Sequence, residues 1–168
     1  MYSFKKYFAL LSIFFISFTF SFLAKNQTSY LTGKKDSWKN PPIIVNCYYS
    51  LFENKRIKEA AEYWDEKGFE IAFYEAKPIK SICKNEKVEG IILIKIARYD
   101  ELDKHTLAFT RRYSSYGIIN AATIYIEYGV FSYPNLLEHE IGHALGLKHI
   151  EEEGHIMHPI YDRMGREY

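Results

Sequence analysis

Apolar residues recur with two different periods along the chain, and these periods predict alternating strands and helices. Residues 53–67 carry apolar side chains at helical spacing, and Gly68 follows as a stop signal. Residues 91–97 are continuously apolar, which is typical of a strand buried inside a sheet. The full pattern predicts strands at 43–49, 69–74, 91–97, 106–112 and 118–128, and helices at 53–67 and 136–145.

The order of these elements predicts the fold class. A strand, a helix, three or four strands and a final helix indicate an α/β (α+β) sandwich, with a mixed sheet of four to five strands and two main helices. Asn135 is placed to cap the second helix at its start, and Gly146 is placed to end it. We expect one folded domain over residues 41–168.

The N-terminal segment, residues 1–24, has the pattern of an export signal. Lys5 and Lys6 precede an apolar run at 7–24, so the charged end is expected to stay inside and the domain to be exported. The run is long enough for either a cleaved signal peptide or an uncleaved membrane anchor. The protein is therefore expected to be secreted or anchored outside the cytoplasmic membrane. Residues 25–40 are polar and are expected to form a linker or N-terminal arm.

Composition and charge exclude several classes of protein. The 168 residues are 48% hydrophobic and include only 9 Gly and 5 Pro, unlike a disordered or collagen-like chain. Lys and Arg total 22 against 21 Asp and Glu, and the first 24 residues hold two of those bases and no acid. The remainder is nearly neutral, so we expect no nucleic-acid partner. We also expect the protein to be a monomer.

The chain contains two cysteines, Cys47 and Cys83. In an exported protein such a pair favours a disulfide over a metal site, and two buried free thiols are the alternative.

Five of the six histidines lie within residues 136–161, and their spacing indicates a metal site. His139 and His143 are four residues apart on the predicted helix, so both imidazoles point to one side, as ligands of a single zinc ion do. His149 is too far along to share that helical face. Gly146 can adopt a positive φ and turn the chain, so that His149 becomes the third ligand. Glu140, beside the first ligand, is placed to act on water at the open fourth position.

The motif HExxHxxGxxH at residues 139–149, followed by Met157, resembles the zinc site and Met-turn of the metzincin endopeptidases. Within that group the chain looks most like the matrixins. Residues 157–161, Met-His-Pro-Ile-Tyr, are similar to the matrixin segment that forms the outer wall of the S1′ pocket. The resemblance implies a zincin-like catalytic domain in which Met157 packs beneath the metal. It assigns the S1′ wall to Pro159, Ile160 and Tyr161.

A weaker resemblance covers residues 107–110 and 117–124. In matrixins the first stretch is the edge strand along which an extended substrate lies, and the resemblance implies that role for Leu107, Ala108, Phe109, Thr110 and Arg111. An edge strand without a partner is the alternative. The loop at 99–105 lacks the histidine pattern of a structural zinc site, and acidic calcium ligands are missing near the inner strand. One catalytic zinc ion is therefore expected, without structural zinc or calcium.

These features predict an exported zinc metalloendopeptidase that hydrolyses extended polypeptides with zinc-activated water and Glu140 as general base. Two alternatives stay open, namely a zinc exopeptidase or cell-wall peptide hydrolase, and a non-catalytic zinc-binding interaction module. Glu138 is expected to be a favourable charge in the first helical turn, and residues 151–153 to form a solvated acidic loop.

Overall fold

The computed structural model describes residues 36–48, 51–75, 80–98 and 100–165. Six strands form one mixed sheet in the order β1-β6-β4-β2-β3, and β5 pairs with β6. The predicted mixed sheet with two main helices is confirmed, and the sixth strand is the two-residue β1. The strands are β1 (Ser37–Trp38), β2 (Ile43–Asn46), β3 (Phe73–Glu75), β4 (Ile91–Ile96), β5 (Ala108–Ser115) and β6 (Ile118–Ile126).

The direction of the strands separates β5 from the rest of the sheet. β2 runs parallel to β3 and β4, and β4 and β1 run parallel to β6. β5 runs antiparallel to β6, and β6 is its one partner among the described strands. The central strand β4 is buried at Ile92, Leu93 and Ile94, as its continuous apolar run predicts.

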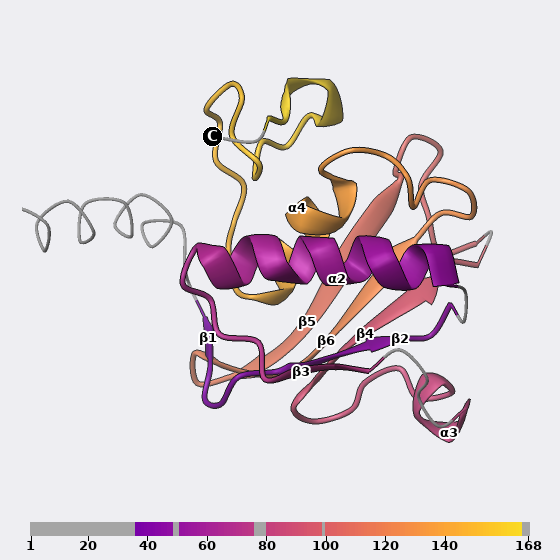
Figure 1. The fold of residues 1–168 in the computed structure, drawn as a ribbon, viewed down its shortest axis with the longest axis vertical. Helices are drawn as coiled ribbons and strands as arrows, with labels where there is room; N and C mark the ends of the chain where they lie inside the picture. The colour runs from indigo at the N-terminus through magenta and orange to yellow at the C-terminus, as the bar shows by residue number, and fades with distance from the viewer. Residues whose placement is uncertain (1–35, 49–50, 76–79, 99, 166–168) are drawn as a thin grey trace, which may run out of the picture. The chain divides into compact units, whose positions relative to one another are not determined.

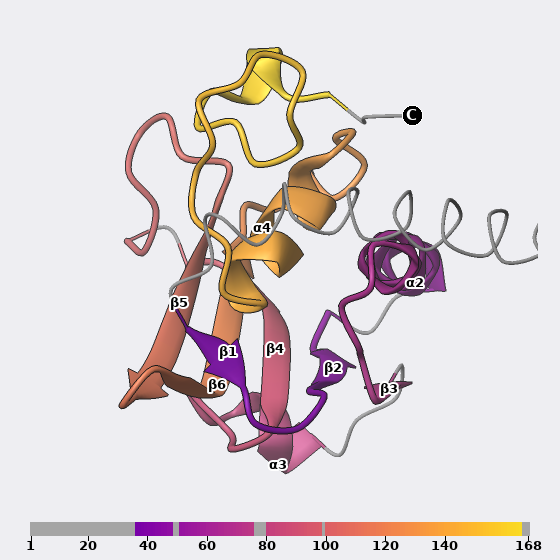
Figure 2. The ribbon, with the colours of Figure 1, turned by 90° about the vertical axis from the view of Figure 1, so that its left-hand side faces the viewer.

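The two main helices, α2 (Leu51–Glu66) and α4 (Leu136–Ala144), pack against each other, and α4 also packs against β5 and β6. In Figures 1 and 2 the yellow C-terminal segment lies next to α4, at the same end of the sheet as the loop that precedes β5. This segment includes a short 3₁₀ helix at Tyr161–Arg163. The helix α4 is thus held between the sheet and the C-terminal segment.

A disulfide ties the small helix α3 (Lys80–Cys83) to the end of β2. Cys47 and Cys83 are bridged, with Cα atoms 5.6 Å apart and a sequence separation of 36 residues. The crosslink holds α3 beside the end of β2.

Three local expectations were wrong. Residues 69–72 are not a strand, because the Phe69 amide donates to the Trp64 carbonyl and the Phe69 ring packs edge-on against the indole. β5 extends to Ser115, because the hairpin turn needs only Tyr116 and Gly117, both at positive φ. Asn135 precedes α4 in the left-handed conformation and makes no side-chain capping hydrogen bond.

The predicted export segment, residues 1–24, and residues 25–35 of the predicted linker lie outside the described residues. The described end of that linker contains β1, where Ser37 and Trp38 pair with β6. Within the described part of the chain, no helix combines the length and apolar character required to cross a membrane.

Candidate metal centre and active site

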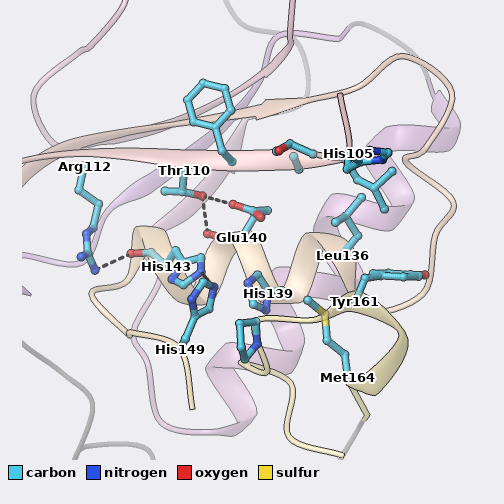
Figure 3. A pocket seen from close by; sticks show the side chains of 15 residues that line it. His105, Thr110, Arg112, Leu136, His139, Glu140, His143, His149, Tyr161 and Met164 are labelled. Carbon is cyan, nitrogen blue, oxygen red and sulfur yellow. Dashed lines mark hydrogen bonds between the residues drawn. The ribbon is translucent and has the colours of Figure 1, made fainter. Parts of the chain in front are cut away.

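The helix α4 and the turn after it bring three histidines together. His139 and His143 lie one turn apart, with ring centroids 4.5 Å from each other. The helix then ends in a Schellman motif, in which Gly146 N–H donates to the His143 carbonyl and Leu147 N–H to the Gly142 carbonyl. Gly146 has a φ of 106°, as the sequence predicts. The reversal places His149 beside the two helical rings (Figure 3).

The three imidazoles fit a single metal ion. Their ligand nitrogens all lie within 4.8 Å of one another, and Nε2 of His143 is 3.1 Å from Nε2 of His149. Two nitrogens on one tetrahedral zinc ion are separated by about 3.3 Å, given zinc–nitrogen bonds near 2.05 Å. Nδ1 of His139 lies 2.9 Å from the Ile156 carbonyl, and Nδ1 of His143 lies 3.0 Å from the Leu147 carbonyl. A carbonyl can only accept, so these Nδ1 atoms carry the protons and both Nε2 lone pairs are available to a metal.

Burial keeps the helical imidazoles neutral. Removal from water, together with the neighbouring His143, lowers the pKa of His139 to about 3. Burial likewise lowers the pKa of His143 to about 4, and it lowers the pKa of the more exposed His149 as well. Neutral imidazole is the form that binds zinc, so the site does not have to lose protons near neutral pH.

Glu140 points into the same cavity from the helix and contacts β5 (Figure 3). It is only 4% exposed, and the Thr110 hydroxyl lies 2.6 Å from its Oε2 atom. Burial raises the pKa of the Glu140 carboxyl to about 7, although the hydrogen bond with Thr110 opposes the rise. A carboxyl with this pKa can both accept and return a proton near neutral pH.

A cavity of about 490 Å³ joins the histidines to β5 and the C-terminal segment. One wall is the edge strand β5, from which Arg112 donates hydrogen bonds to the His143 and Leu147 carbonyls at 3.1 and 3.3 Å. The opposite wall is mostly apolar. The lining residues are His105, Thr106, Leu107, Ala108, Phe109, Thr110, Arg112, Leu136, His139, Glu140, His143, His149, Pro159, Tyr161 and Met164.

Most of the residues singled out from the sequence for the active site lie around this cavity, but Arg111, Ile160 and Met157 do not line it. Arg111 points to the other face of β5, where its guanidinium lies over the rings of Phe109 and Tyr125. Ile160 is half exposed and turned away. Sequence reasoning did not anticipate Arg112, although its position two residues after Thr110 places both on one face of a strand. It also missed Leu136 and Met164, for which the sequence carries no comparable signal.

Met157 is fully buried beneath α4 and supports the helix that bears the ligands. Its backbone is fixed on both sides, since its N–H donates to Nδ1 of His155 and its carbonyl accepts from the Ile150 amide. Nδ1 of His158 accepts from the Ile160 amide in a similar way. Both of these additional histidines are buried and lie outside the three-histidine group.

Glu138 lies in the first turn of α4, as expected, and is in addition buried between the two main helices. The side chain is 0% exposed, and Arg56 from α2 donates to both carboxylate oxygens at 3.2 Å. The Glu138 carbonyl accepts from the indole N–H of Trp64 at 2.6 Å. The residue before the first metal-binding histidine is therefore a buried contact between the two helices.

The comparisons with known proteins agree with this geometry. The matrixin family model, of peptidase family M10, matches residues 59–168. The match covers more than half of the chain and includes α4, all three histidines and the C-terminal segment. The comparison with curated proteins finds no match.

Proposed function

Because this chain belongs to the matrixin family of zinc metallopeptidases, we propose that it is an exported endopeptidase that cleaves extended polypeptides. The observation that carries the proposal is the shared cavity, which holds three metal-competent imidazoles and one buried carboxyl beside an edge strand. A purely structural zinc site has no need of a carboxyl with a pKa near neutrality.

The three histidines and Glu140 have different roles in the proposed reaction: the histidines bind the metal and Glu140 transfers the proton. His139, His143 and His149 would hold zinc, which supplies a Lewis acid that acidifies water and polarises the scissile carbonyl. Glu140 takes the proton of the attacking water on its carboxylate and then returns it to the leaving amine. In the metal-free protein, burial raises the pKa of this carboxyl to about 7, a value in the range useful for accepting and returning a proton.

The shape of the cavity supports an extended substrate. β5 has β6 as its one described partner, so its outer backbone groups can pair with a peptide strand. The apolar wall formed by Leu136, Pro159, Tyr161 and Met164 suits an apolar side chain beside the scissile bond.

The charges around the cavity favour an endopeptidase over an exopeptidase. Among the described residues that line it, Glu140 is the one carboxylate, so no second acid is present to bind a free amino terminus. A free amino terminus therefore meets no dedicated counter-charge among the described lining residues, which argues against an aminopeptidase.

Export is part of the proposal, and two features support it. Residues 1–24 have the sequence of a signal or anchor, and the Cys47–Cys83 disulfide is typical of proteins in oxidising compartments. The mass of the exported product distinguishes a cleaved signal from a retained anchor.

The test compares the zinc-loaded wild type with Glu140→Gln on an unstructured protein substrate. A matched control is Glu152→Gln, which removes an equally charged side chain from an exposed loop. We expect internal fragments by mass spectrometry from the wild type and the control, and a loss of at least about 100-fold in Glu140→Gln with zinc content unchanged. Equal cleavage by all three proteins would contradict the role of Glu140. Stepwise shortening from one end would replace the endopeptidase with an exopeptidase.

A further inference from the structure

The side chains of β5 alternate between two environments. Thr110 and Arg112 face α4, whereas Phe109 and Arg111 lie on the other face, against the ring of Tyr125. The strand proposed to bind substrate therefore also sends polar side chains to the helix that carries the catalytic groups. Of these side chains, Thr110 is the one that contacts Glu140 (Figure 3).

The Thr110 hydroxyl makes two contacts with the same glutamate. Its Oγ1 atom is 2.6 Å from Oε2 of Glu140 and 3.0 Å from the backbone carbonyl oxygen of Glu140. A hydroxyl has one proton to donate and lone pairs to accept. It can donate to the carboxylate, or it can accept from the protonated carboxyl while donating to the carbonyl. One hydroxyl thus holds the Glu140 side chain both before and after the proton transfer.

No other described side chain hydrogen-bonds the Glu140 carboxyl. Glutamate has three rotatable side-chain bonds, so an unrestrained carboxyl would occupy several positions in a cavity of this size. The hydrogen bond also joins β5 to α4, so the position of the base is set relative to the strand proposed to bind the peptide. General base catalysis depends on that relative position.

We propose that Thr110 is a positioning residue that orients the Glu140 carboxyl toward the scissile bond. The inference rests on the proposed function, in which Glu140 is the general base. It predicts that the hydroxyl matters for turnover, while substrate binding and metal affinity depend on other groups.

Three variants separate this role from a structural one. Thr110→Val removes the hydroxyl with little change in shape, and Thr110→Ser keeps it. Thr123→Val makes the same replacement on the neighbouring strand β6, where the hydroxyl donates to the Glu86 carbonyl away from the cavity. We expect Thr110→Val to lower kcat by about 10- to 100-fold, with KM and zinc affinity within about twofold of wild type. Thr110→Ser should retain kcat to within about threefold, and Thr123→Val should retain it fully.

A second readout needs no activity. In crystals of metal-free Thr110→Val, the Glu140 carboxyl should leave its wild-type position or occupy several, whereas Thr110→Ser should keep it. An unchanged carboxyl in the valine variant would overturn the proposal. An unchanged kcat in Thr110→Val would also overturn it. The same holds if Thr110→Ser or Thr123→Val loses as much activity as Thr110→Val, or if the loss in Thr110→Val follows a loss of zinc.

Including Glu140→Gln identifies which idea fails. If Glu140→Gln is inactive and Thr110→Val is fully active, only the positioning role is wrong. If Glu140→Gln keeps full activity, Glu140 is not the general base, and that part of the proposed function is wrong.

Discussion

Gly142 lies inside α4, although glycine is unfavourable within a helix. Its replacement by alanine tests how tightly the helix packs on Met157. A Cβ atom at this position would lie 2.4 Å from Sδ of Met157 and 2.6 Å from Cζ2 of Trp64. Ordinary contacts between heavy atoms are about 3.5–4.0 Å, so both neighbours would have to move by about 1 Å.

The surroundings make that movement costly. Met157 and Trp64 are both fully buried, and the indole is held by a hydrogen bond to the Glu138 carbonyl. The Trp64 ring also packs edge-on against Tyr63 and Phe69. Overfilling such a site costs about 1–3 kcal/mol, and the gain in helix propensity from glycine to alanine returns about 1 kcal/mol. Because two separate contacts are violated, we expect a net loss of about 2 kcal/mol.

Urea unfolding of the zinc-free protein measures this loss without a contribution from metal binding. In a Met157→Ala background, Gly142→Ala should lower the free energy of unfolding by less than it does in the wild type. The clash with the Met157 sulfur is then gone, while the clash with Trp64 remains. The reasoning is refuted if Gly142→Ala is as stable as wild type or more stable, since helix propensity alone would give that result.

Three further predictions concern the rest of the fold. Arg56→Met should lower the free energy of unfolding by about 3–5 kcal/mol, because it removes the charged partner of the buried Glu138 carboxylate. Adding Glu138→Leu should restore most of that stability, and no recovery in the double variant would argue against this reason. Replacing Cys47 and Cys83 with serine should lower the free energy of unfolding in urea by about 3–4 kcal/mol, because the bridge closes a loop with a 36-residue separation in the unfolded chain. An unchanged unfolding midpoint would refute this prediction. The free energy of unfolding of zinc-free Glu140→Gln should fall by about 4 kcal/mol between about pH 7 and about pH 5. In the unfolded chain His139 and His143 take up protons over this range, whereas in the folded protein their lowered pKa values keep them neutral. The wild type should lose less over this range, since its buried carboxyl, with a pKa raised to about 7, takes up a proton when folded.

The strands that sequence predicts well are those whose apolar runs are buried in the sheet. β2 and β4 begin at Ile43 and Ile91, as expected. A continuous run of β-branched residues is typical of a strand that is buried on both faces of a sheet. The strand expected at 69–74 begins only at Phe73, because Phe69 packs on Trp64 from the preceding helix. That contact is local, since Phe69 follows Trp64 by five residues at the end of the helix, but an alternating pattern of apolar residues does not distinguish it from a strand.

The ligand residues of the site could be predicted because their spacing is local. A helix repeat and a positive-φ glycine are enough to bring His139, His143 and His149 together. The partners of these residues come from elsewhere in the chain. The contact of Thr110 with Glu140 depends on how β5 lies against α4, which no local pattern encodes.

The central claim is that three imidazoles from α4 and the following turn hold one zinc ion beside a buried carboxyl. Anomalous diffraction from crystals of the zinc-loaded protein, collected at the zinc absorption edge, tests it directly. The account predicts one strong peak, with Nε2 of His139, His143 and His149 each at about 2.0–2.1 Å and Glu140 outside bonding distance. A peak without His149, or one bonded directly by the Glu140 carboxylate, would contradict it.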